Sequence, residues 1–124
     1  ESSDLLDYIA RLGDAYRACA YANPHFYELM FGRPIPGFDP PERSRREARS
    51  GFSLLRETVQ RAINAGCLAG DADEICHLLW VVAHGFVDLR LHGLVQAEDE
   101  AARANKHTYA VFESYRPGRE KEVT

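Results

Sequence analysis

The sequence lacks the features that mark membrane-spanning and disulfide-stabilised proteins. Its longest purely apolar run, Leu78 to Ala83, is far too short to cross a bilayer. The chain has only three cysteines, an odd number with no C-x-x-C spacing: Cys19, Cys67 and Cys76. We therefore expect reduced thiols in the core of a cytoplasmic protein without membrane association, neither a disulfide framework nor a zinc site.

Positive charge is also in short supply. The 124 residues contain 15 Lys and Arg against 19 Asp and Glu, so the net charge is −4. Affinity for nucleic acid rests largely on cationic side chains that meet phosphates, and a mildly acidic chain offers no general attraction of this kind. Any DNA binding is expected to come from outside this chain. The chain begins at Glu1 without Met, which we interpret as a piece of a longer protein.

Motifs for nucleophilic and phosphate chemistry are missing as well. There is no G-x-S-x-G sequence and no Gly-rich phosphate loop. Cys76 and His77 are adjacent in sequence, so their side chains diverge on a helix and cannot act as a pair. We expect no enzyme and no cofactor.

One pattern is typical of a metal site but is incomplete. Glu74 and His77 have the E-x-x-H spacing of di-iron helix bundles, and three more ligand-type residues continue the strip: His84, Asp88 and His92. Such a site needs a second E-x-x-H motif and two further glutamates, and the sequence has no second motif. We expect no metal, and we keep a small helical-bundle metal-binding protein as an alternative.

Strand signals are absent, and apolar residues recur at helical spacing throughout. The pattern predicts an all-α fold in which the helices cover residues 4–22, 24–31, 42–65, 72–92 and 98–115. The length fits one domain over residues 1–115, arranged as a five-helix antiparallel bundle. Proline, glycine and charged residues dominate residues 116–124, so we predict a disordered tail there.

The segment 72–92 has two apolar faces back to back when it is wound at 100° per residue. Trp80 and His84 lie on one face, and Leu78 and Leu89 on the other. A monomer of this size usually buries one face of a helix, so the second needs a partner. We predict a homodimer with a four-helix interface about a two-fold axis. The predicted interface residues are Leu78, Val82, Gly85, Phe86, Leu89, Thr108, Val111 and Phe112.

Gly85 gives this dimer weak support. A glycine inside a helix costs roughly 1 kcal/mol against alanine, and close approach of another helix is a common compensation. The alternative is a position without a role. Which face of the segment meets the dimer mate and which meets a pocket stays open.

His84 has two interpretations. It is either a core histidine held by Asp88, four residues on, or a polar contact in an apolar pocket. The aromatic patch around Tyr27 and Met30 can likewise be core or pocket lining. The pocket interpretation predicts a small hydrophobic or aromatic ligand with at least one polar group. The predicted ligand-binding residues are Tyr16, Tyr27, Met30, Phe52, Leu55, Val59, Trp80 and His84.

Three passages resemble one class of TetR-family C-terminal domains. Trp80-Val-Val-Ala-His84-Gly85 resembles the W-x-x-x-H-G signature of that class. Residues 65–71, Ala-Gly-Cys-Leu-Ala-Gly-Asp, look like the turn before the signature helix. Residues 16–32, YRACAYANPHFYELMFG, are similar to the family's helix, Asn-Pro and short aromatic helix. The matches occur in order and span most of residues 5–94.

The resemblance implies a ligand-binding and dimerisation domain of a transcriptional repressor that senses a small molecule. In the family a helix-turn-helix module of roughly 50 residues precedes this domain and reads operator DNA. This chain has no such module, so we expect DNA binding only through the missing part. A helix bundle that uses its second apolar face for a different protein, an adaptor, remains an alternative.

Overall fold

The structure is a computed structural model that describes residues 2–31 and 42–119. All regular elements in these two ranges are helical, as predicted. The long helices are α1 (Ser2–Ala22), α3 (Glu42–Asn64), α4 (Ala72–Leu91) and α5 (Ala97–Ser114), and α2 (Pro24–Phe31) is short. Residues 116–119 of the predicted tail form a turn, and residues 120–124 lie outside the described residues. No helix in the two described ranges has the length and apolarity that a bilayer span requires.

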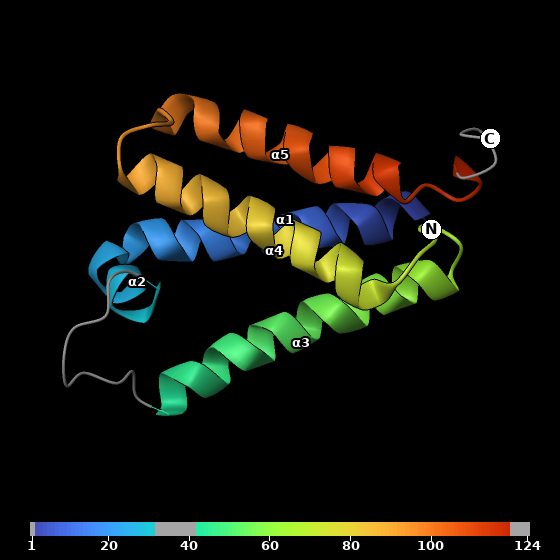
Figure 1. Ribbon diagram of the computed structural model, residues 1–124, viewed down its shortest axis with the longest axis horizontal. Coiled ribbons are helices and arrows are strands. Elements are labelled where there is room, and N and C mark those ends of the chain that lie inside the picture. Colours follow the sequence, from blue (N-terminus) through green and yellow to red (C-terminus); the bar gives the residue numbers. More distant parts are fainter. Residues whose placement is uncertain (1, 32–41, 120–124) are drawn as a thin grey trace.

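Helix α4 lies at the centre of the bundle and contacts α1, α3 and α5 (Figure 1). The consecutive helices α3, α4 and α5 alternate in direction, as expected for an antiparallel bundle. Helix α1, however, runs in the same direction as α4 beside it. Helix α2 follows the C-terminal end of α1 and packs against it. The second half of α4 is therefore close to both α1 and α2, which positions the candidate site.

Local sequence signals set the ends of α4. The Asp71 carboxylate accepts a hydrogen bond of 3.1 Å from the backbone N–H of Glu74, and thereby caps the first turn. At the other end Gly93 has a φ of +74°, and the N–H of Leu94 donates to the carbonyl of Leu89 at 2.8 Å. Only a residue without a Cβ adopts this φ readily, so the glycine ends the helix. The predicted range 72–92 agrees with these ends to within one residue, and the side chain of Leu94 beyond the helix is exposed.

The main core lies where α1, α3, α4 and α5 meet the turn before α4. Its fully buried members include Ile9, Val59, Leu68 and Ile75. A second, smaller cluster joins α1, α2 and α4, and its buried residues are Ala20, Tyr27 and Val87. This second cluster supports the residues of the candidate site.

The cysteines are free thiols, as expected, but only two of them are in the core. Cys67 and Cys76 are buried, and burial raises the pKa of Cys76 to about 11. Cys19 is exposed on α1, so the prediction of three core thiols was wrong for this residue. Cys19 follows the apolar spacing along α1, but this spacing does not show whether another helix covers the side chain.

Candidate functional site

Two tyrosine hydroxyls meet the ring of His84. Tyr27 on α2 lies 2.9 Å from the Nδ1 atom of His84 on α4. Tyr16 on α1 lies 3.1 Å from Nε2 and 3.3 Å from Nδ1 of the same ring. Residues from two helices, α1 and α2, thus hold the imidazole of α4 by hydrogen bonds. These three residues were all predicted to belong to one site.

Aromatic rings continue from His84 toward α3. The ring of Trp80 lies one turn before His84 and meets it edge to face, with centroids 4.9 Å apart. Phe52 on α3 contacts Trp80 at a centroid distance of 5.4 Å. Trp80 and Phe52 were also predicted site residues, and the structure brings both to the imidazole's side of α4. The result is a row of apolar rings that ends in a polar group.

Burial disfavours the charged forms of the polar groups in this cluster. It lowers the pKa of His84, which disfavours the imidazolium ion. Burial is also the main reason why the pKa values of Tyr16 and Tyr27 lie above the ordinary tyrosine value, and mutual interaction of the two side chains adds to the increase for Tyr16. The cluster therefore offers neutral donors and acceptors.

Asp88, the other proposed partner of His84, lies beside His92. The Nδ1 atom of His92 is 2.8 Å from the backbone carbonyl of Asp88 and 3.5 Å from its carboxylate, and both side chains are exposed. The described residues contain no group of three or more His, Cys, Asp or Glu side chains that could hold a metal ion. The strip from His77 to His92 therefore forms no metal site of this kind.

The remaining predicted ligand residues differ in their surroundings. Val59 is fully buried in the main core, and Leu55 packs against the same cluster. The side chain of Met30 lies outside the described residues. The predicted set therefore divides into five residues that gather around Trp80 and His84, two that belong to the main core, and one that is not described.

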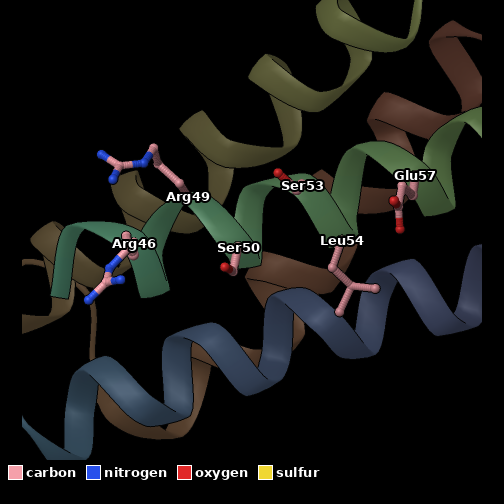
Figure 2. Close-up of a pocket in the computed structure, with 6 residues that line it drawn as sticks. All are labelled: Arg46, Arg49, Ser50, Ser53, Leu54 and Glu57. Carbon is pink, nitrogen blue, oxygen red and sulfur yellow. The ribbon is translucent and has the colours of Figure 1, made fainter. Parts of the chain in front are cut away.

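Two surface hollows lie away from this cluster. A hollow of about 440 Å³ runs along the first half of α3, and Figure 2 shows its lining residues Arg46, Arg49, Ser50, Ser53, Leu54 and Glu57. All six are exposed, and Arg46 and Arg49 extend to different sides of the helix, so their charges do not converge on one point. A second hollow of about 450 Å³ is lined by Asp4, Leu5, Tyr8 and Arg61. Neither contains a predicted ligand residue.

The predicted dimer residues separate into exposed and buried groups. Leu78 and Leu89 are 39% and 38% exposed, and Gly85 between them is exposed with no atom within 4 Å of an added Cβ. Val82 and Val111 are half-buried. The other three are buried within the subunit: Phe86, Thr108 and Phe112. Among the described residues, therefore, no helix approaches Gly85, and only part of the predicted interface is available to a partner.

The sequence analysis missed a buried ionic network between α1 and α5. The Nε atom of Arg17 donates to the Oε2 atom of Glu100 at 2.6 Å, and the Tyr21 hydroxyl donates to the same oxygen. The guanidinium of Arg90 on α4 lies 3.9 Å above the Tyr21 ring. A signal was available, because the buried residues of α5 recur every four positions: Glu100, Ala104, Thr108 and Phe112.

Comparison with known proteins identifies the family. Residues 9–112 match the family model described as tetracyclin repressor-like, C-terminal domain. No curated protein and no solved structure matches the chain. The matched region contains the whole of α2, α3 and α4 and most of α1 and α5. The chain belongs to the tetracyclin repressor-like C-terminal domains, a family of regulatory domains that are not enzymes.

Proposed function

We propose that this chain is the effector-sensing and dimerisation domain of a cytoplasmic TetR-like transcriptional repressor of the W-x-x-x-H-G type. The signature residues support this assignment by their arrangement. Trp80 and His84 are in ring contact, and α1 and α2 each supply a hydroxyl to His84. A half-buried polar group at the end of an apolar aromatic row is typical of a small-molecule site.

The effector is a small hydrophobic or aromatic molecule. It binds where five side chains from four helices gather: Tyr16, Tyr27, Phe52, Trp80 and His84. The observation that carries the proposal is the convergence of Tyr16 and Tyr27 on His84. A ligand oxygen that replaces one of these hydroxyls separates α1 or α2 from α4.

Helix α1 carries the response to the DNA-reading part of the repressor. In the proposed repressor a helix-turn-helix module joins this domain through α1. A ligand that favours one position of Tyr16 relative to His84 favours one position of α1. The ligand changes the distance between the two DNA-reading modules of a dimer only if its affinity differs between the two positions of α1. This difference in affinity limits the size of the shift.

The dimer mate is a second copy of this chain and covers the exposed side of α4. Leu78, Val82, Gly85 and Leu89 follow one stripe at helical spacing, and three of them are apolar side chains that the subunit leaves at least partly uncovered. An apolar stripe on a central helix is stabilised when a symmetric partner buries it. Gly85 lies in the middle of this stripe and permits close approach of the partner helix.

The experiment is a thermal-shift screen of hydrophobic compounds, followed by affinity measurements on variants. Trp80→Ala and His84→Ala should each weaken the affinity of every confirmed ligand. Leu54→Ala, which removes an exposed leucine of α3 that is not one of the five site residues, should leave the affinity unchanged. Unchanged affinity for all ligands in both Trp80→Ala and His84→Ala would show that the site is elsewhere.

A further inference from the structure

We propose that the site at His84 selects uncharged aromatic compounds with one hydrogen-bonding oxygen, such as phenols and aryl ketones, over aromatic carboxylates and ammonium compounds. This inference rests on the proposed function, because it names the class of effector for the same site. The groups that meet at His84, the nature of the surrounding rings and the positions of the nearest charges support it.

The polar groups at the site are neutral groups that both donate and accept. The hydroxyls of Tyr16 and Tyr27 lie 3.1 and 2.9 Å from ring nitrogens of His84. A neutral imidazole has one donor and one acceptor nitrogen, and each hydroxyl can take either role. A phenol hydroxyl or a ketone oxygen matches these partners. A carboxylate can accept the same hydrogen bonds, but it also brings a negative charge into the site.

Two described arginines near Tyr16 and Tyr21 are already engaged. Arg17, which follows Tyr16 in sequence, donates to Glu100 and to Asp14, each at 2.6 Å. Arg90 lies over the ring of Tyr21. An aromatic carboxylate at His84 would lose water without gaining either of these cations as a partner, and burial of an unpaired charge is costly.

The site also disfavours a cation. Burial lowers the pKa of His84, so the surroundings oppose positive charge on the imidazole, next to the position that a ligand group would occupy. They oppose negative charge too, since burial raises the pKa of Tyr27 and the carboxylates of Asp88 and Glu28 raise it further. The faces of Trp80 and Phe52 can attract a cation, but such attraction is weak where part of the ring surface is exposed.

The test is isothermal titration calorimetry of the whole chain at neutral pH with four probes that share one ring system. The probes are naphthalene, 2-naphthol, 2-naphthoate and 2-naphthylmethylammonium. We expect 2-naphthol to bind about tenfold more tightly than naphthalene, because it gains a hydrogen bond at His84. The two ions should bind more weakly than naphthalene, since each loses solvation without a charged partner.

Two variants show whether the preference comes from the named groups. Tyr27→Phe and His84→Leu should reduce the ratio of 2-naphthol to naphthalene affinity toward one. Tyr8→Phe is the matched control, because it removes an exposed α1 hydroxyl outside the site. Tyr27→Phe keeps the ring that packs in the second core cluster, so it serves as the test if His84→Leu fails to fold.

The outcomes separate this inference from the proposed function. Binding of 2-naphthoate or 2-naphthylmethylammonium at least as tight as that of 2-naphthol would overturn the inference and leave the site intact. If no probe binds, or if Trp80→Ala and His84→Ala leave probe affinities unchanged, the site itself is wrong and the inference falls with it. NMR titration of His84 needs no ligand, and a ring protonated at neutral pH would also overturn the inference.

Discussion

Arg17 on α1 and Glu100 on α5 form an ion pair in which both residues are almost completely buried, 3% and 4% exposed. Glu100 also accepts a hydrogen bond from Tyr21, and Arg17 donates a second one to Asp14. Charged groups are seldom buried to this degree unless their hydrogen bonds are satisfied. Among the described residues that are not exposed, no fully buried side-chain nitrogen or oxygen lacks a partner. The pair therefore fixes the position of α1 against α5.

Removing one partner of this pair should strongly destabilise the domain. Arg17→Met leaves the Glu100 carboxylate buried without its cation, and we expect a loss of about 3–5 kcal/mol in the free energy of unfolding. The measurement is urea unfolding at one fixed protein concentration. The double variant Arg17→Met, Glu100→Leu should recover much of the loss, because it leaves no buried unpaired charge.

Arg49→Met is the control for this experiment. Arg49 forms an ion pair with Glu42 at 2.7 Å, but both side chains are 63% exposed. Solvent-exposed pairs contribute roughly 0–1 kcal/mol, so this variant should unfold almost as the unchanged domain does. An Arg17→Met domain as stable as the Arg49→Met domain would contradict the assigned role of the buried pair.

His84 should make the domain less stable in mild acid. Because burial lowers the pKa of His84 in the folded chain, the unfolded chain binds more protons between that pKa and the ordinary value of about 6.5. The free energy of unfolding should therefore fall as the pH falls through this window. His84→Gln should remove this part of the pH dependence, as measured by urea unfolding at a series of pH values.

His92 provides a control of opposite sign. A hydrogen bond to the Asp88 carbonyl, followed by the Asp88 charge, raises the pKa of His92. Its stabilising effect is complete below the ordinary pKa and is lost as the pH rises through the raised value. His92→Gln should therefore remove a slope that runs the other way. If His84→Gln and His92→Gln changed the pH dependence of the free energy of unfolding in the same direction, the lowered pKa assigned to His84 would be wrong.

Gly70 should tolerate no side chain, in contrast to Gly51. Gly70 has a φ of +146°, and an added Cβ would lie 2.8 Å from the Cδ1 atom of Tyr115. Gly70→Ala should destabilise the domain by roughly 1–3 kcal/mol. Gly51 is exposed within α3 with open space around it, so Gly51→Ala should stabilise the helix by about 1 kcal/mol. Thermal unfolding measures the stability of both variants. If Gly70→Ala and Gly51→Ala changed the stability equally, the close packing of Tyr115 against Gly70 would be contradicted.

The proposed dimer can be tested on the exposed stripe of α4. Leu89→Glu places a charge in the proposed interface, and light scattering after size exclusion should show the mass falling from twice the chain mass to 14.0 kDa. Leu54→Glu, at 43% exposure on α3, is the matched control and should remain a dimer. A mass of 14.0 kDa for the unchanged chain at micromolar concentration would rule out the proposal.

The helices were predictable because their signals are local. Apolar spacing marked the helices, and the predicted range 72–92 agrees with α4 to within one residue. The grouping of Tyr16, Tyr27 and His84 was also predicted, because aromatic side chains with polar tips around a histidine suggest a pocket. That second prediction used residue type alone, since Tyr16 and His84 are 68 positions apart.

Long-range packing was harder to predict. A helical wheel shows which side chains share a face, but it does not show which helix covers that face. Phe86 and Phe112 were therefore assigned to a partner subunit, although they are buried within their own chain. Glu100 was missed because it lies in an acidic first turn that looks solvated, whereas its actual environment depends on Arg17, 83 positions away.

Tyr16 and Arg17 are neighbours on α1, yet one contacts His84 on α4 and the other contacts Glu100 on α5. A rotation or translation of α1 that changes the first contact must also change the second, since one rigid turn of helix carries both. An effector bound at the imidazole, as proposed, would therefore also strain the ion pair between Arg17 and Glu100 on the other side of α1. A stronger ion pair would make α1 resist this movement more.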